Sequence, residues 1–185
     1  MVKLENPKTL HKLSVAVFSI YIWLLVWVIV LKFNSYVVIS DGHALATLPL
    51  LHRLGKNWIP FHSLQIDFAW DGIKQPLMNF IIYLPFGFFV ARFTNSKWKT
   101  IVLALASSVV FELIQLFTGL GGCDTTDVII NTLGGTVGML LYHLKIRPKL
   151  ENVVNIVQIC VYAPVAIYAL VNTIICFEWY KGLLY

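Results

Sequence analysis

Five polar side chains that could bind or react with a ligand fall within one stretch, residues 111–138. They are the carboxylates Glu112, Asp124 and Asp127 and the amides Gln115 and Asn131. The sequence around them is otherwise apolar enough to cross a membrane, where an ionised carboxylate costs about 2.5–3.5 kcal/mol or more. Carboxylates retained in such surroundings indicate a functional site.

Carboxylates held close together support two kinds of chemistry. Hard divalent cations take oxygen ligands, so Glu112, Asp124 and Asp127 could bind one. Alternatively, like charges that cannot all ionise leave a protonated acid beside a base, and Glu112 and Asp127 are the candidates for that catalytic pair. The third interpretation is structural. Polar side chains would hydrogen-bond across two helices, at about 0.6–2 kcal/mol per bond, and Asp124 would be only a turn or N-cap residue.

The composition is that of a membrane protein. The chain has 185 residues, enough for one domain, of which 58% are hydrophobic and only 12% charged, whereas about a quarter of the residues in soluble domains are charged. The basic residues lie in short groups between apolar runs, as membrane topology requires. We therefore expect membrane lipids as partners and no nucleic acid.

The apolar runs predict an all-α fold, a polytopic bundle of about five transmembrane helices, because each approaches the ~20 residues needed to cross a bilayer. The predicted spans are residues 14–33, 76–93, 100–118, 127–142 and 153–177. The single membrane domain, 1–185, then comprises an N-terminal arm with the first span (1–33), an outer interfacial loop with short helices (34–75), a three-span core (76–144) and the fifth span with a C-terminal tail (145–185).

Small residues predict that the third and fourth spans pack tightly. Gly134 and Gly138 have the small-xxx-small spacing of close helix pairs, and Ala104 and Ser108 give the third span small positions. The short glycine-bearing turn between these spans favours antiparallel contact. We therefore expect the polar residues of both spans to meet.

The second span adds one polar residue to this group. Asn79 lies near the start of that span and is predicted to face the bundle rather than lipid. Pro76 is expected in the first turn of the helix, where a missing backbone N–H costs nothing.

The basic residues also predict the orientation, because Lys and Arg gather on the cytoplasmic side. With the N-terminus in the cytoplasm, nine basic residues lie inside and five outside. The inner ones are Lys3, Lys8, Lys12, Arg92, Lys97, Lys99, Lys145, Arg147 and Lys149, and the outer ones are Lys32, Arg53, Lys56, Lys74 and Lys181. The N-terminus is therefore predicted to be cytoplasmic, the C-terminus extracytoplasmic, and the polar cluster outward-facing.

Other chemistry is sparse. The three cysteines are an odd number, which disfavours a disulfide framework, although Cys123 and Cys176 share the predicted outer side and could form a bond. His43, His52 and His62 lack the spacing of a zinc site. No hydrolase, phosphate-loop or dinucleotide motif occurs, so no cofactor is expected apart from the divalent cation considered above.

Four motifs resemble those of the VanZ-like family and occur in its order. They are NWIPFHSL (57–64), NFIIYLPFGFF (79–89), FELIQLF (111–117) and DTTDVIINTLGGTVG (124–138). The resemblance implies a small multi-pass protein of a bacterial cell membrane, related to a type member associated with resistance to the glycopeptide teicoplanin. The positions that match family motifs are Asn79, Pro85, Gly87, Glu112, Gln115, Asp124, Asp127, Asn131 and Gly134. Many relatives have a basic residue just before the first Asp, where this chain has Gly121, Gly122 and Cys123.

Three functions are compatible with these features. The preferred one is an envelope protein whose outer polar pocket binds a lipid-linked or amphiphilic ligand, such as a cell-wall precursor or a lipoglycopeptide. The pocket would comprise Asn79, Glu112, Gln115, Asp124, Asp127 and Asn131. The alternative is an enzyme acting on a lipid-linked head group through Glu112 and Asp127. A small transporter or flippase is least favoured, because the polar residues stop in the outer half of the membrane.

Overall fold

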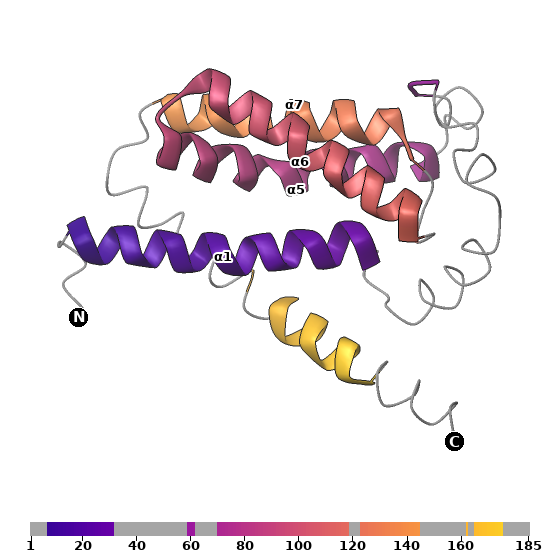
Figure 1. Cartoon of the computed structure of the whole chain (residues 1–185), viewed down its shortest axis with the longest axis horizontal. Helices are drawn as coiled ribbons and strands as arrows, with labels where there is room; N and C mark the ends of the chain where they lie inside the picture. Colours follow the sequence, from indigo (N-terminus) through magenta and orange to yellow (C-terminus); the bar gives the residue numbers. More distant parts are fainter. Residues whose placement is uncertain are drawn as a thin grey trace. The chain divides into compact units, whose positions relative to one another are not determined.

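The structure is a computed structural model that describes residues 7–31, 59–61, 70–118, 123–144, 162 and 165–175. These residues form helices, and no strand occurs among them (Figure 1). The helices are α1 (Pro7–Leu31), α5 (Trp70–Thr94), α6 (Lys97–Thr118), α7 (Thr125–His143) and a short helix, Val165–Ile175. The predicted all-α fold is confirmed for this part of the chain.

Three helices are long and apolar enough to cross a membrane, and they correspond to the first three predicted spans. The qualifying segments are His11–Ile29 in α1, Gly72–Thr94 in α5 and Lys97–Thr118 in α6. Helix α7 has 19 residues, about 28 Å at 1.5 Å per residue, but its Thr, Asn and Gly residues make it less apolar. Most of the predicted fifth span lies outside the described residues, so the number of five spans stays a prediction.

The chain divides into two compact units, which are Met1–Val37 with Ile146–Tyr185, and Val38–Lys145. In the first unit, α1 packs against the short C-terminal helix. Trp27 of α1 donates a hydrogen bond from Nε1 to Oγ1 of Thr173, at 3.3 Å, and its ring meets that of Tyr168 edge-on.

The second unit contains α5, α6 and α7, which lie side by side in Figure 1. A two-residue turn joins α5 to α6. Asn95 in this turn has a positive φ of 47°, which Asn tolerates better than most residues, and its N–H donates to the carbonyl of Ala91. Ser96 then begins α6, because its hydroxyl accepts a hydrogen bond from the N–H of Lys99. Helices α5 and α6 are consequently antiparallel.

Helix α5 begins earlier than predicted. The expected loop, residues 34–75, is wrong at its C-terminal end, because α5 starts at Trp70. Pro76 therefore lies inside the helix rather than in its first turn. The charges of Asp71 and Lys74 made this segment look like a loop, although charged residues also suit the first turns of a helix at a membrane surface. The rest of the predicted loop, apart from residues 59–61, lies outside the described residues.

Helix α7 packs most extensively against α5, and the two run parallel. A Cβ atom added at Gly87 would run into the backbone of Gly135, and one added at Gly138 would run into the carbonyl of Leu84. Gly134 faces the carbonyl of Phe80 in the same way. The glycines of the fourth predicted span therefore permit close approach, as expected, but mainly to α5 rather than to α6.

Helix α6 contacts α7 through its small residues. A Cβ at Gly135 would lie 2.7 Å from the Cβ of Ala104, which is itself fully buried. Ser108, one turn further along α6, is also fully buried. The predicted role of Ala104 and Ser108 as small packing positions is thus confirmed.

We predict that Gly87→Ala destabilises the protein, because the added methyl group meets helix backbone, which cannot rotate away. Overpacking of this kind costs about 1–3 kcal/mol. Thermal unfolding in detergent should show a lower Tm. Ile81→Ala, at a position 48% exposed on the same helix, should leave the Tm nearly unchanged; equal Tm values for all three proteins would contradict the close α5–α7 contact.

Candidate functional site

A buried hydrogen bond between α6 and α7 sets the register of the two helices. Nδ2 of Asn131 donates to Oγ of Ser108 at 2.8 Å. Both side chains are almost completely inaccessible, at 1% and 0% exposure. Because the helices are antiparallel, residues that follow Ser108 on α6 lie beside residues that precede Asn131 on α7.

One turn beyond Ser108, Glu112 reaches the start of α7. Its Oε2 accepts a hydrogen bond from the backbone N–H of Asp124 at 2.7 Å, and the side chain is 2% exposed. Asp124 is the N-cap of α7, since its Oδ1 accepts from the N–H of Thr126 at 2.8 Å. The N-cap interpretation of Asp124 is therefore confirmed, and its carboxylate is engaged with its own helix.

Asp127 lies in the first turn of α7, one turn before Asn131, and is buried. Its Oδ2 accepts a hydrogen bond from Nε2 of Gln75, an exposed residue of α5, at 3.1 Å. The N-terminus of a helix carries a partial positive charge of about half a unit, which favours a carboxylate at this position. Asp127 is therefore joined to both α7 and α5 at the same end of the unit.

Tyr83 of α5 lies close to Ser107 of α6. Its side chain is fully buried, and its hydroxyl is 3.4 Å from Oγ of Ser107. The carboxyl groups of Glu112 and Asp127 both lie within electrostatic range of this hydroxyl. Residues from all three helices therefore surround one buried phenol.

A separate segment contacts the start of α7. Phe61 donates its backbone N–H to Oγ1 of Thr126 at 2.9 Å, and Thr126 is 3% exposed. Phe61 has a φ of 60°, which is uncommon for an aromatic residue. The hydrogen bond joins the first of the four sequence motifs to the last.

The structure thus brings four of the six predicted site residues to one end of α6 and α7, namely Glu112, Asp124, Asp127 and Asn131. We call this the acidic end. Gln115 is buried on the same face of α6 as Glu112, almost one turn further along. Asn79 is half-buried and one turn along α5 from Gln75, and its side chain forms no hydrogen bond with any described residue.

No three His, Cys, Asp or Glu side chains among the described residues are gathered as a metal site would require. The divalent-cation hypothesis for Glu112, Asp124 and Asp127 therefore gains no support and stays a prediction. Cys123 is a free cysteine, and Cys176 lies outside the described residues, so the bond between them that the sequence allowed stays a prediction. The three loop histidines lie outside the described residues.

The pKa of the Cys123 thiol is affected by the carboxylates of the acidic end. Burial raises its pKa above the ordinary value of 9.0, and the negative charges of Glu112 and Asp124 raise it further. These effects favour the neutral thiol, because a thiolate would be poorly solvated and would face two carboxylates.

Sequence reasoning missed Gln75, Tyr83 and Thr126. Gln75 precedes Asn79 by four residues, so placing the helix start at Trp70 would have put both amides on one face. Tyr83 lies in an apolar run and could not be distinguished from a core aromatic residue. Nothing in the sequence links Thr126 to Phe61.

The membrane-length apolar helices indicate a polytopic membrane protein, and the carboxyl groups of Glu112 and Asp127 are buried where two of the three core helices meet. A family model described as VanZ/LLP1 matches residues 18–146, which is more than half of the chain and includes every residue of the acidic end. The chain belongs to the VanZ/LLP1 family.

One curated relative is Protein VanZ from Enterococcus faecium, which is 29% identical over 166 residues. The alignment covers 84% of this chain and 92% of that protein. No solved structure matches the chain. The helix Val165–Ile175 lies beyond the family match, as expected from the motifs, which end at residue 138.

We predict that Glu112→Gln lowers the pKa of Cys123. In a variant whose only cysteine is Cys123, the rate of alkylation should rise with pH through a midpoint above 9.0. Removing the Glu112 charge removes one cause of the raised pKa, so that midpoint should move to lower pH. Asp127→Asn removes the same charge from a residue that does not act on Cys123; an equal shift in that control would contradict the specific proximity of Glu112.

Proposed function

We propose that this protein contributes to resistance against teicoplanin-type glycopeptides, or to maintenance of the cell envelope, by binding a lipid-linked or amphiphilic ligand at the acidic end. Membership of the VanZ/LLP1 family supports the resistance-related role. The ligand would be a cell-wall precursor or a lipoglycopeptide, bound at Asn79, Glu112, Gln115, Asp124, Asp127 and Asn131.

The observation that carries this proposal is the position of Glu112. The carboxylate is 2% exposed inside a helix long enough to span the membrane, yet it lies beside the N-cap of α7 at the end of its own helix. A purely structural polar residue could be an uncharged amide, which costs less to bury. A carboxylate at this position is a stronger hydrogen-bond acceptor than an amide, and it would recognise a ligand with N–H and O–H donors.

The ligand would approach along Gln75. This residue is exposed, and its amide donates to the buried Asp127, so it connects the surface of α5 with the interior of the cluster. A head group that displaces this amide would gain access to a carboxylate already polarised by the N-terminus of α7.

The predicted orientation would place this end on the outer side of the membrane. Arg92, Lys97 and Lys99 lie near the other end of α5 and α6, which the positive-inside rule assigns to the cytoplasm. A ligand from the cell wall or the medium would then reach the acidic end without crossing the bilayer.

A second candidate function is an enzyme acting on a lipid-linked head group. The position of Tyr83 favours it, because a buried hydroxyl near two carboxyl groups is an arrangement that proton transfer can use. Glu112 and Asp127 would then be the acid and base. We rank this second because no described side chain is placed as a nucleophile.

We predict that Glu112→Gln abolishes resistance to teicoplanin in a susceptible host that expresses the protein. Glutamine keeps the shape and the acceptor for the Asp124 N–H, so the amount of protein in the membrane and its Tm should be nearly unchanged. The minimum inhibitory concentration, measured against immunoblot levels, checks this.

Leu113→Ala is the matched control, because Leu113 is the next residue and is 41% exposed. It should retain resistance. If Glu112→Gln instead lowers the amount of protein while resistance per molecule persists, Glu112 is a structural hydrogen-bonding residue and the proposed function fails.

We also predict that a single cysteine at residue 97 is labelled only from the cytoplasmic side. A membrane-impermeant maleimide should react with that variant in inverted vesicles but not in intact cells, because the basic residues of this end remain inside. A cysteine at residue 118, the last residue of α6, should show the opposite pattern. Reversed labelling would overturn the outward-facing site.

A further inference from the structure

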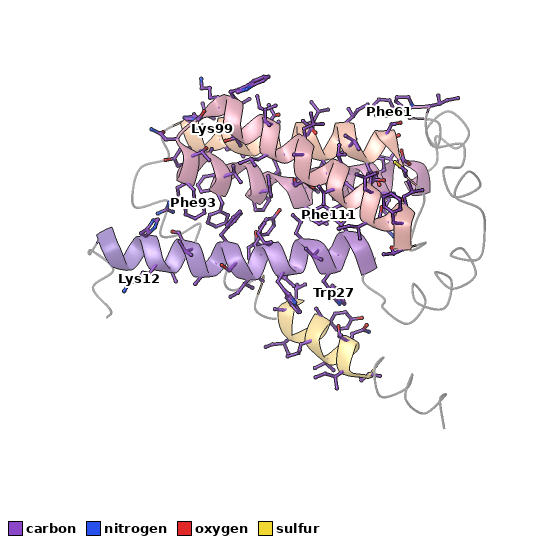
Figure 2. The ribbon with its side chains drawn as sticks, in the orientation of Figure 1. Lys12, Trp27, Phe61, Phe93, Lys99 and Phe111 are labelled. Carbon is purple, nitrogen blue, oxygen red and sulfur yellow. The ribbon has the colours of Figure 1, made fainter. Side chains whose placement is uncertain are left out.

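The end of the three-helix unit opposite Phe61 presents a different surface. Figure 2 shows Lys99 and Phe61 at opposite ends of the helices. At the Lys99 end, α6 begins with Lys97, Trp98 and Lys99, all exposed. Trp98 is 73% exposed, against 43% for Trp23 and 3% for Trp27.

Among the described residues of α5, α6 and their connecting turn, the charged side chains at this end are all basic. Arg92 lies near the end of α5, and no Asp or Glu occurs between it and Glu112. The three carboxylates Glu112, Asp124 and Asp127 lie at the opposite end of the helices, the acidic end.

The turn between α5 and α6 determines where Lys97, Trp98 and Lys99 lie. Asn95 and Ser96 end one helix and begin the next through the hydrogen bonds described above. Lys97 and Lys99 therefore flank Trp98 within a single turn of helix. Long cationic side chains place their charge at the head groups while an amphipathic indole ring lies at the same depth.

We propose that this surface, consisting of Lys97, Trp98 and Lys99, binds the head groups of anionic phospholipids. The charge complementarity selects an acidic lipid over a zwitterionic one, and Trp98 supplies the apolar contact at the boundary of the acyl region. Membrane topology requires only that basic residues lie on the cytoplasmic side. A highly exposed indole between two lysines goes beyond this requirement and favours direct contact with lipid.

The size of the expected preference follows from the charges. One lysine near an anionic membrane surface changes partitioning by roughly fivefold. Two lysines next to one indole should therefore produce a measurable enrichment of anionic lipid around Trp98, which weakens at high salt because exposed charges are screened.

The test uses the full chain in nanodiscs that contain brominated phosphatidylglycerol or brominated phosphatidylcholine. Bromine quenches tryptophan fluorescence on contact, and the difference between the wild-type protein and Trp98→Phe isolates the signal of Trp98. We expect brominated phosphatidylglycerol to quench Trp98 several-fold more effectively per mole of lipid. The double variant Lys97→Gln, Lys99→Gln should lose most of this preference, whereas Lys97→Arg, Lys99→Arg should keep it.

Lys74→Gln is the matched control, because Lys74 is an exposed lysine near the start of α5, at the opposite end. It should leave the Trp98 preference unchanged, and each variant should keep the wild-type Tm. Equal quenching by the two lipids in the wild-type protein, or an equal loss in Lys74→Gln, would overturn the inference and leave these lysines with a role in topology alone.

Discussion

The contact between α5 and α7 is the constraint on which the rest of the core depends. Gly87 and Gly135 bring the two helix backbones together where no side chain could fit. This contact fixes the depth and rotation of α7, and therefore the level at which Asp127 and Asn131 lie. The polar groups of α7 can meet Glu112 and Ser108 only because the glycines have already positioned the helix.

Hydrogen bonds at the acidic end offset part of the cost of burying polar groups. Asn131 bonds to Ser108, Glu112 to the backbone of Asp124, and Asp127 to Gln75. Each such bond is worth only about 0.6–2 kcal/mol in a membrane protein, comparable with or below the cost of placing one ionised carboxylate in hydrocarbon, about 2.5–3.5 kcal/mol. These bonds therefore specify register more than they stabilise the fold.

Local chemistry could be predicted from the sequence, whereas contacts between distant segments could not. Apolar runs located α6 well, because a membrane fixes the length of a span, but α1 begins at Pro7, inside the predicted N-terminal arm. The N-cap role of Asp124 was already among the alternatives. The glycines predicted a tight helix pair but not that α5 is the main partner, since small residues do not encode which helix approaches. Gln75 was missed because charges near the membrane surface resemble a loop, and the Phe61–Thr126 bond spans 65 residues.

The negative charges near the start of α7 exceed the partial positive charge of its N-terminus. Its N-terminus contributes about half a positive charge, while Glu112, Asp124 and Asp127 contribute three carboxyl groups close to it. The pKa of Cys123 is raised mainly by burial and further by the negative charges of Glu112 and Asp124. Gln75 of α5 supplies one donor to this group through its hydrogen bond to Asp127. The amphiphilic ligand proposed for the site would add further N–H and O–H donors to the same carboxyl groups.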